Sequence, residues 1–219
     1  MKTESLSLYH IIRAPKTTKE KPPVLFMFHG YGSDENDLFS FASELPDELF
    51  IISVRAPYPM QPFGNAWYAI YFDNTNGKFS DDKQAIESRD KIANFITEAV
   101  TAYDLDPNNV TLLGFSQGCI LSYAVALSYP EKVSKVIALS GYLNPDILKD
   151  GYASNDFSNI DIYCSHGSVD QVIPVQWARK APEFLKELGI HTTLKEFPVG
   201  HGVHPSNFYE FNNWLTEKI

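Results

Sequence analysis

A serine stands between two glycines at a point where the apolar pattern of the chain changes. Residues 110–113 are typical of a short buried strand, and residues 119–127 are apolar nearly all round, as in a buried helix; Gly114-Phe-Ser-Gln-Gly118 joins them. A sharp strand-to-helix corner projects a serine hydroxyl clear of the sheet, and glycines remove the Cβ atoms that would collide there. The corner also aims the first N–H groups of the helix at the place where negative charge would develop. The pattern predicts that Ser116 is a nucleophile and that the Gln117 N–H supplies half of an oxyanion hole.

A serine nucleophile needs a base, and the base needs a carboxylate that fixes its tautomer. Asp170 follows the predicted strand 160–164, and His201 follows the last predicted strand, 192–197. Taken singly, Asp170 would be a turn aspartate and His201 a solvated loop histidine. Because Ser116, Asp170 and His201 each follow a separate strand, in the chain order that α/β hydrolases use, they favour a catalytic triad.

His204 and Asp161 are the rival base and acid. His204 precedes Pro205, which biases it toward an extended conformation, whereas His201 lies between glycines closer to the strand end. Asp161 lies within a predicted strand rather than after it. We therefore prefer His201 and Asp170.

The loop that begins at His29 supplies a second candidate oxyanion donor. It reads His29-Gly-Tyr-Gly32 directly after the apolar run 24–28, and ligands collect at the carboxyl ends of parallel strands. We expect the backbone N–H of Tyr31 to complete the oxyanion hole, and His29 to be structural because the strand end buries it. A plain turn into a helix capped by Ser33 would explain the same residues, and both interpretations can hold together.

An aromatic and proline-rich stretch, residues 55–72, follows the predicted strand 50–54. Loops are normally polar, so we interpret Phe63, Trp67 and Tyr68 as substrate-binding residues that wall an acyl pocket. The alternative is a hydrophobic flap that packs onto the body without a ligand role. If exposed, such a flap would also be a plausible homodimer contact.

Strand patterns and helical periodicities alternate along the chain. Helical spacing covers 82–103, 175–188 and 208–215, and Pro182 should kink or split the second of these helices. The predicted strands are 6–12, 24–28, 50–54, 110–113, 133–139, 160–164 and 192–197. This alternation predicts a single α/β domain over residues 1–219, with a mainly parallel sheet and helices on both faces.

Composition limits the partners and the compartment. A net charge of -9 over 219 residues argues against nucleic acid and against an anionic membrane surface, which both attract basic proteins. The N-terminus lacks the apolar core of a signal peptide and no run is long enough for an integral membrane span, so we expect a cytoplasmic protein. Cys119 and Cys164 both lie in apolar segments and should stay reduced, without a disulfide or a metal site.

These motifs resemble the carboxylesterase/phospholipase branch of α/β hydrolases, which includes small bacterial carboxylesterases and acyl-protein thioesterases. The likeness runs over about residues 20–219. It rests on four motifs: His-Gly-x-Gly at 29–32, Gly-Phe-Ser-Gln-Gly at 114–118, His-Gly-x-x-Asp at 166–170 and Gly-His at 200–201. The resemblance implies an α/β-hydrolase fold, the triad and oxyanion residues named above, and no metal or organic cofactor.

The activity implied is hydrolysis of a small-molecule ester or thioester of small to medium acyl groups through an acyl-enzyme. Tyr31 stands where the family commonly has leucine, Cys119 where a second glycine is common, and Pro182 in a helix that is usually unbroken. None of these departures removes a catalytic group. Two other interpretations stay open: a hydrolase fold that only binds a ligand, and a peptidase that uses the same triad.

Overall fold

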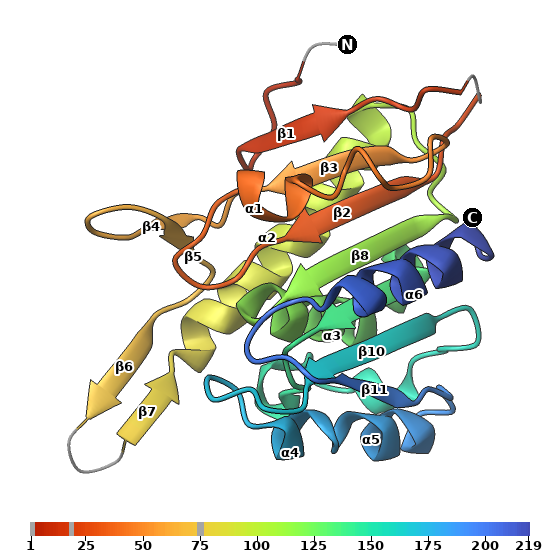
Figure 1. The fold of residues 1–219 in the computed structure, drawn as a ribbon. Helices are drawn as coiled ribbons and strands as arrows, with labels where there is room; N and C mark the ends of the chain where they lie inside the picture. The colour runs from red at the N-terminus through yellow and green to blue at the C-terminus, as the bar shows by residue number, and fades with distance from the viewer. Residues whose placement is uncertain (1–2, 18–19, 74–76) are drawn as a thin grey trace.

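Seven strands form one sheet in the order β1–β3–β2–β8–β9–β10–β11 (Figure 1). The computed structural model describes residues 3–17, 20–73 and 77–219. The strands of this sheet are β1 (His10–Arg13), β2 (Val24–Phe28), β3 (Phe50–Val54), β8 (Val110–Phe115), β9 (Lys135–Leu139), β10 (Asp161–Gly167) and β11 (Leu194–Phe197). Only β1 is antiparallel to its neighbour, so the other six strands end at the same edge of the sheet.

The central strands are apolar throughout because both faces of the sheet are covered. Every residue of β2 and β3 is buried, and successive residues of β2 belong to two different hydrophobic clusters. Phe26 and Phe28 pack in one cluster, whereas Leu25 and Met27 pack in the other. The period of two along a strand thus divides the core into two layers.

Helices cover both faces, which confirms the predicted α/β-hydrolase architecture. α2 (Asp82–Ala102), α3 (Gln117–Ser128) and α5 (Ala181–Glu187) contribute to the layer that contains Phe26. α1 (Asn36–Phe39) and α6 (Pro205–Thr216) contribute to the layer that contains Leu25, and α6 crosses the near face in Figure 1. α3 is buried along its whole length, as its uniformly apolar sequence predicts.

The remaining elements are short. They are β4 (Tyr58–Pro59), β5 (Asn65–Ala66), β6 (Ile70–Asp73), β7 (Gly77–Ser80), α4 (Val175–Ala178), and the 3-10 helices η1 (Pro130–Lys132), η2 (Pro145–Ile147) and η3 (Tyr152–Ser154). β4 pairs with β5 and β6 pairs with β7, so the stretch 55–72 that we expected to be an aromatic loop contains one hairpin and most of the first strand of a second, both outside the main sheet (Figure 1). No described helix is long and apolar enough to span a bilayer.

One local prediction is confirmed and another needs correction. The helix predicted over 175–188 is split, as expected from Pro182: α4 ends at Ala178, and Pro182 lies in the first turn of α5, where its missing N–H costs nothing. Ser33 does not cap a helix: α1 begins at Asn36 after Glu35, and Ser33 instead forms a β-bridge with Asn65.

Candidate active site

The corner that carries Ser116 joins β8 to α3. Ser116 has φ 53° and ψ -117°, a left-handed conformation that costs a non-glycine residue about 1–3 kcal/mol. A Cβ on Gly118 would lie 1.9 Å from the Phe28 carbonyl oxygen, and one on Gly114 would lie 2.3 Å from the Gly118 oxygen. The two glycines are therefore required because backbone atoms of β2, β8 and α3 meet at this point.

The structure brings Ser116, Asp170 and His201 into one hydrogen-bonded chain. His201 Nε2 lies 3.0 Å from Ser116 Oγ, and His201 Nδ1 lies 2.7 Å from Asp170 Oδ2. Because Asp170 can only accept when ionised, Nδ1–H donates to it and Nε2 is left to accept from the serine hydroxyl. This is the geometry that a general base needs.

The Asp170 carboxylate is held by donors on both oxygens. Its side chain is fully buried, and Oδ1 accepts from the N–H groups of Val172, at 2.8 Å, and Ile173, at 3.0 Å. Burial acts to raise the pKa of Asp170, but the hydrogen bonds from His201 and from the two N–H groups outweigh it, so the pKa is lowered. The carboxylate therefore stays anionic at neutral pH.

Two loops at neighbouring strand ends hold Asp170 and His201 together. Ser168 N–H donates to the Phe197 carbonyl at 2.8 Å. A Cβ on Gly167 would lie 2.1 Å from the Gly200 oxygen, so the loop after β10 and the loop after β11 touch through their backbones. β10 and β11 are parallel neighbours, so the loops that follow them leave the same edge of the sheet side by side.

The rival residues lie elsewhere. His204 is the N-cap of α6, where its Nδ1 accepts from Ser206 N–H at 3.1 Å. Asp161 forms an exposed ion pair with Lys218. Neither is among the described residues that line the cleft at Ser116. His29 is buried and bonds only backbone groups, the Gly30 carbonyl and the Ala56 N–H, as expected of a structural residue.

The candidate oxyanion donors are the N–H groups of Tyr31 and Gln117. Neither N–H donates to an acceptor among the residues that the structure describes. The Tyr31 loop is braced by the β4–β5 hairpin, because Gly32 N–H donates to the Asn65 carbonyl at 2.9 Å. Gly64, at φ 84°, packs so closely that a Cβ there would lie 2.1 Å from the Gly32 oxygen.

Gln117 has a second role that the sequence did not reveal. Its side-chain Oε1 accepts from Trp67 N–H at 2.9 Å, and its Nε2 donates to the Tyr68 carbonyl at 2.8 Å. The side chain thus fixes residues 67 and 68 against the start of α3. The available signal was a polar side chain in an otherwise apolar helix, which must find partners when buried.

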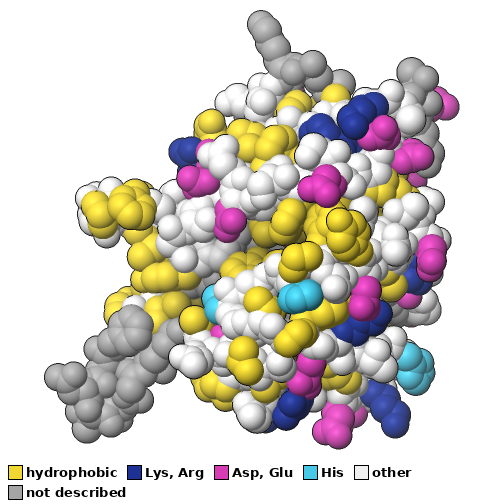
Figure 2. All heavy atoms as spheres, in the orientation of Figure 1, with side chains coloured by type: hydrophobic (Ala, Val, Ile, Leu, Met, Phe, Trp, Pro, Cys, Tyr) yellow, Lys and Arg dark blue, Asp and Glu magenta, His cyan; other side chains and the backbone are white. Residues whose placement is uncertain are grey.

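A cleft of about 460 Å³ opens over Ser116 and His201. Tyr68, a predicted substrate contact, lines it, but the other two predicted substrate contacts lie apart from it. Trp67 is completely buried and its Nε1 donates to the His29 carbonyl at 2.9 Å, so it is held inside the core. Phe63 is 80% exposed near the tip of the β4–β5 hairpin, where Figure 2 shows hydrophobic side chains on a projection from the body.

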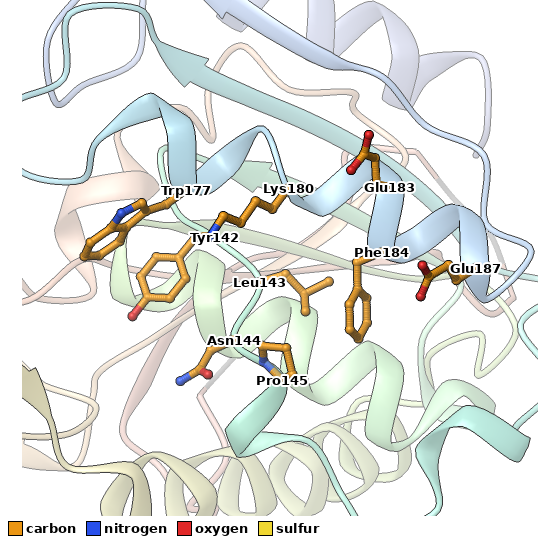
Figure 3. A pocket seen from close by; sticks show the side chains of 9 residues that line it. All are labelled: Tyr142, Leu143, Asn144, Pro145, Trp177, Lys180, Glu183, Phe184 and Glu187. Atoms are coloured by element: carbon orange, nitrogen blue, oxygen red, sulfur yellow. The ribbon is translucent and has the colours of Figure 1, made fainter.

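A larger groove of about 760 Å³ adjoins the cleft and shares Tyr142, Asn144 and Trp177 with it. The rings of Tyr142 and Trp177 meet edge to face, with centroids 5.2 Å apart. Figure 3 shows this pair at one end of the groove, with Leu143 and Phe184 further along it and charged side chains around them. A chain that extended past the pair would meet an apolar surface.

The overall arrangement is shared with solved esterase structures. The crystal structure of a carboxylesterase from Bacillus cereus superposes with a TM-score of 0.81 over 97% of this chain and 95% of that chain, at 18% identity. Acyl-protein thioesterase 2 from Zea mays superposes with a TM-score of 0.73 over 95% and 98%, at 21% identity. These similarities show the α/β-hydrolase fold.

Sequence comparison places the chain more narrowly. Residues 9–219 match the profile of the phospholipase/carboxylesterase family. Acyl-protein thioesterase 1 from Kluyveromyces lactis is 29% identical over 212 residues, which are 91% of this chain and 91% of that protein. The chain therefore belongs to the phospholipase/carboxylesterase family, and it is an esterase- or thioesterase-type hydrolase.

Proposed function

We propose that the chain hydrolyses carboxylic esters or thioesters of small to medium acyl groups, with Ser116 as nucleophile, His201 as general base and Asp170 as the carboxylate that orients it. The observation that carries this proposal is the hydrogen-bonded chain from Ser116 Oγ through the His201 ring to the buried Asp170 carboxylate. The cleft above Ser116 and His201, with a volume of about 460 Å³, is large enough for a small acyl group. The names of the relatives support both the ester and the thioester assignment.

In the proposed mechanism, His201 Nε2 takes the proton of Ser116 as the serine oxygen attacks the acyl carbon. The carbonyl oxygen becomes an oxyanion, and the N–H groups of Tyr31 and Gln117 stabilise it. His201 then returns the proton to the leaving alkoxide or thiolate, which departs and leaves an acyl group on Ser116. A water molecule repeats the sequence and releases the carboxylic acid.

Two features of the site suit it to this work. The strained backbone of Ser116 holds the hydroxyl at the edge of the sheet, so little reorganisation is needed before attack. The free N–H groups are already ordered by the β4–β5 hairpin and by the helix start. Preorganised donors of this kind are usually the largest single contribution to catalysis of acyl transfer.

The test uses wild-type protein and Ser116→Ala side by side. We expect a fluorophosphonate probe to label the wild type at Ser116 and to leave the variant unlabelled. Hydrolysis of p-nitrophenyl esters and of a thioester should fall by about 10³–10⁶-fold in the variant. Hydrolysis by Ser116→Ala near the wild-type rate would contradict the assignment of the nucleophile.

The same experiment separates the other interpretations. A fold that only binds a ligand would hydrolyse none of the esters, and a peptidase would cleave a peptide amide in preference to them. A lysophospholipid included in the panel, with esters of increasing chain length, defines the leaving group and the acyl length. Cytoplasmic location and a homodimer stay predictions, to be checked by fractionation and by sedimentation.

A further inference from the structure

A second buried histidine, His166, lies behind the proposed catalytic carboxylate. It is the last residue but one of β10, and its side chain is completely buried. Its Nε2 lies 2.8 Å from the Ile173 carbonyl oxygen and 3.3 Å from Asp170 Oδ2. The mechanism above gives this ring no role.

The surroundings of the ring fix its protonation. Both neighbours of Nε2 can only accept, so Nε2 carries a proton and donates it to the Ile173 carbonyl, with the Asp170 carboxylate close by. The other nitrogen, Nδ1, is buried and has no hydrogen-bond partner among the described residues. A proton on Nδ1 would therefore be a buried donor without an acceptor, which is costly. A single ring proton on Nε2 therefore fits these surroundings.

The ring acts on the carboxylate through the loop that carries it. Oδ1 of Asp170 accepts from the N–H groups of Val172 and Ile173, and Oδ2 accepts from His201. His166 Nε2–H donates to the carbonyl of Ile173, one of these donor residues, and Nε2 lies 3.3 Å from Oδ2, where the N–H dipole attracts the negative charge. The position of the carboxylate therefore depends on the loop that His166 holds.

We propose that His166 is a positioning residue: it holds the Asp170 carboxylate in the plane that directs Oδ2 at His201 Nδ1, and so keeps His201 in the tautomer that can accept from Ser116. This inference rests on the proposed function of the triad. It also explains the spacing of His166 and Asp170. The Ile173 carbonyl, which accepts the His166 proton, and the neighbouring Asp170 carboxylate belong to the one loop that starts at the end of the strand of His166.

The test compares His166→Gln with His166→Met. The two side chains are nearly equal in length and shape, but only glutamine can place an N–H where the ring Nε2 lies. We expect His166→Gln to keep kcat within about threefold of wild type, and His166→Met to lose about 10–100-fold in kcat, a range typical when a group that orients a catalytic residue is removed. KM should change little in either variant, because the substrate does not touch His166.

Two spectroscopic measurements do not depend on turnover. ¹⁵N NMR of histidine-labelled wild-type protein should show His166 as the neutral Nε2–H tautomer. The downfield proton of the hydrogen bond between His201 and Asp170 should be kept in His166→Gln and lost or shifted in His166→Met. Thermal unfolding of both variants controls for a general loss of structure.

Equal activity of the two variants, whether both high or both low, would overturn the proposal, because the donor would then not matter. An Nδ1–H tautomer or an imidazolium at His166 in the wild type would overturn it as well, even if neither variant folded. Failure of the proposed function is a separate result. It would appear as wild-type protein that hydrolyses no ester, or as Ser116→Ala with undiminished activity, while the NMR measurements would still judge the role of His166.

Discussion

The two sides of the cleft are built in different ways. On the side of the proposed acid–base pair (the acid–base side), Asp170 and His201 lie on the exit loops of neighbouring parallel strands, and the sheet register brings those loops together. On the side of the proposed oxyanion donors (the oxyanion side), the Tyr31 loop packs against the β4–β5 hairpin, which lies outside the main sheet. The first side follows from strand order alone, whereas the second depends on close backbone contacts between segments that share no sequence pattern. Substitutions on the two sides should therefore lower activity for different physical reasons.

The largest effect is expected at the buried carboxylate. Asp170→Asn keeps the shape of the side chain but removes the charge and allows an amide N–H to face His201, which favours the wrong tautomer. We expect kcat for ester hydrolysis to fall by about 10⁴-fold, with KM little changed. Steady-state kinetics on a p-nitrophenyl ester measures this. A loss of less than tenfold would mean that Asp170 is not the orienting acid.

On the oxyanion side, Gly64→Ala should lower kcat by displacing the backbone of the Tyr31 loop. A Cβ at residue 64 would overlap the Gly32 oxygen, so the Tyr31 loop must shift. We expect kcat to fall by up to about 10²-fold, the scale of losing one oxyanion donor. Gly151→Ala is the matched control, because Gly151 has a similar φ of 78° with no atom within 4 Å of its Cβ position. It should lose stability but keep full kcat, and equal losses in the two variants would refute the bracing role.

Substitutions of two aromatic residues in the same region should distinguish an effect on fold stability from an effect on substrate binding. Trp67→Phe removes the donor to the buried His29 carbonyl, and we expect the free energy of unfolding to fall by about 1–3 kcal/mol. Phe63→Ala, at an exposed position, should change it by less than about 0.5 kcal/mol. Urea denaturation measures both. A stable Trp67→Phe variant with a raised KM would restore Trp67 as a substrate contact.

Lowering the pH should reduce the stability of the fold through Asp170. Because the folded pKa of Asp170 lies below its unfolded value of about 3.9, its charge stabilises the fold above that pH, and this contribution is lost as the pH falls through the lowered folded pKa. Wild type should therefore lose more stability than Asp170→Asn between about pH 5 and pH 3. Glu35, whose pKa is lowered by its hydrogen bonds from Arg55, titrates in both proteins and cancels in the difference. Parallel loss in the two proteins would exclude this linkage.

The smallest effect is expected in the groove beyond Tyr142 and Trp177. Phe184→Ala removes part of its apolar surface, so kcat/KM should fall several-fold for esters whose acyl chain is long enough to enter the groove. Esters of acetate and butyrate should be unaffected. A uniform change over the whole chain-length series would place the acyl chain elsewhere.

The sequence predicted most of the fold because buried strands and amphipathic helices leave periodic patterns. It also predicted that Ser116, Asp170 and His201 would meet, because the exit loops of parallel strands share one edge. It could not predict the β4–β5 and β6–β7 hairpins, whose strands are only two to four residues long. The sequence predicted Trp67 to be a substrate contact because an indole N–H that donates to a carbonyl inside the core leaves no distinct sequence pattern. The side chain of Gln117 was missed because its partners are backbone atoms about 50 positions away.

The left-handed backbone of Ser116 has a consequence for how the protein can change. Glycine adopts that conformation without strain, so selection for thermal resistance alone would favour glycine at residue 116. Under the proposed mechanism, serine at this position serves the reaction and not the stability of the fold. In a descendant that had lost its chemistry, position 116 is where the sequence would be expected to drift first.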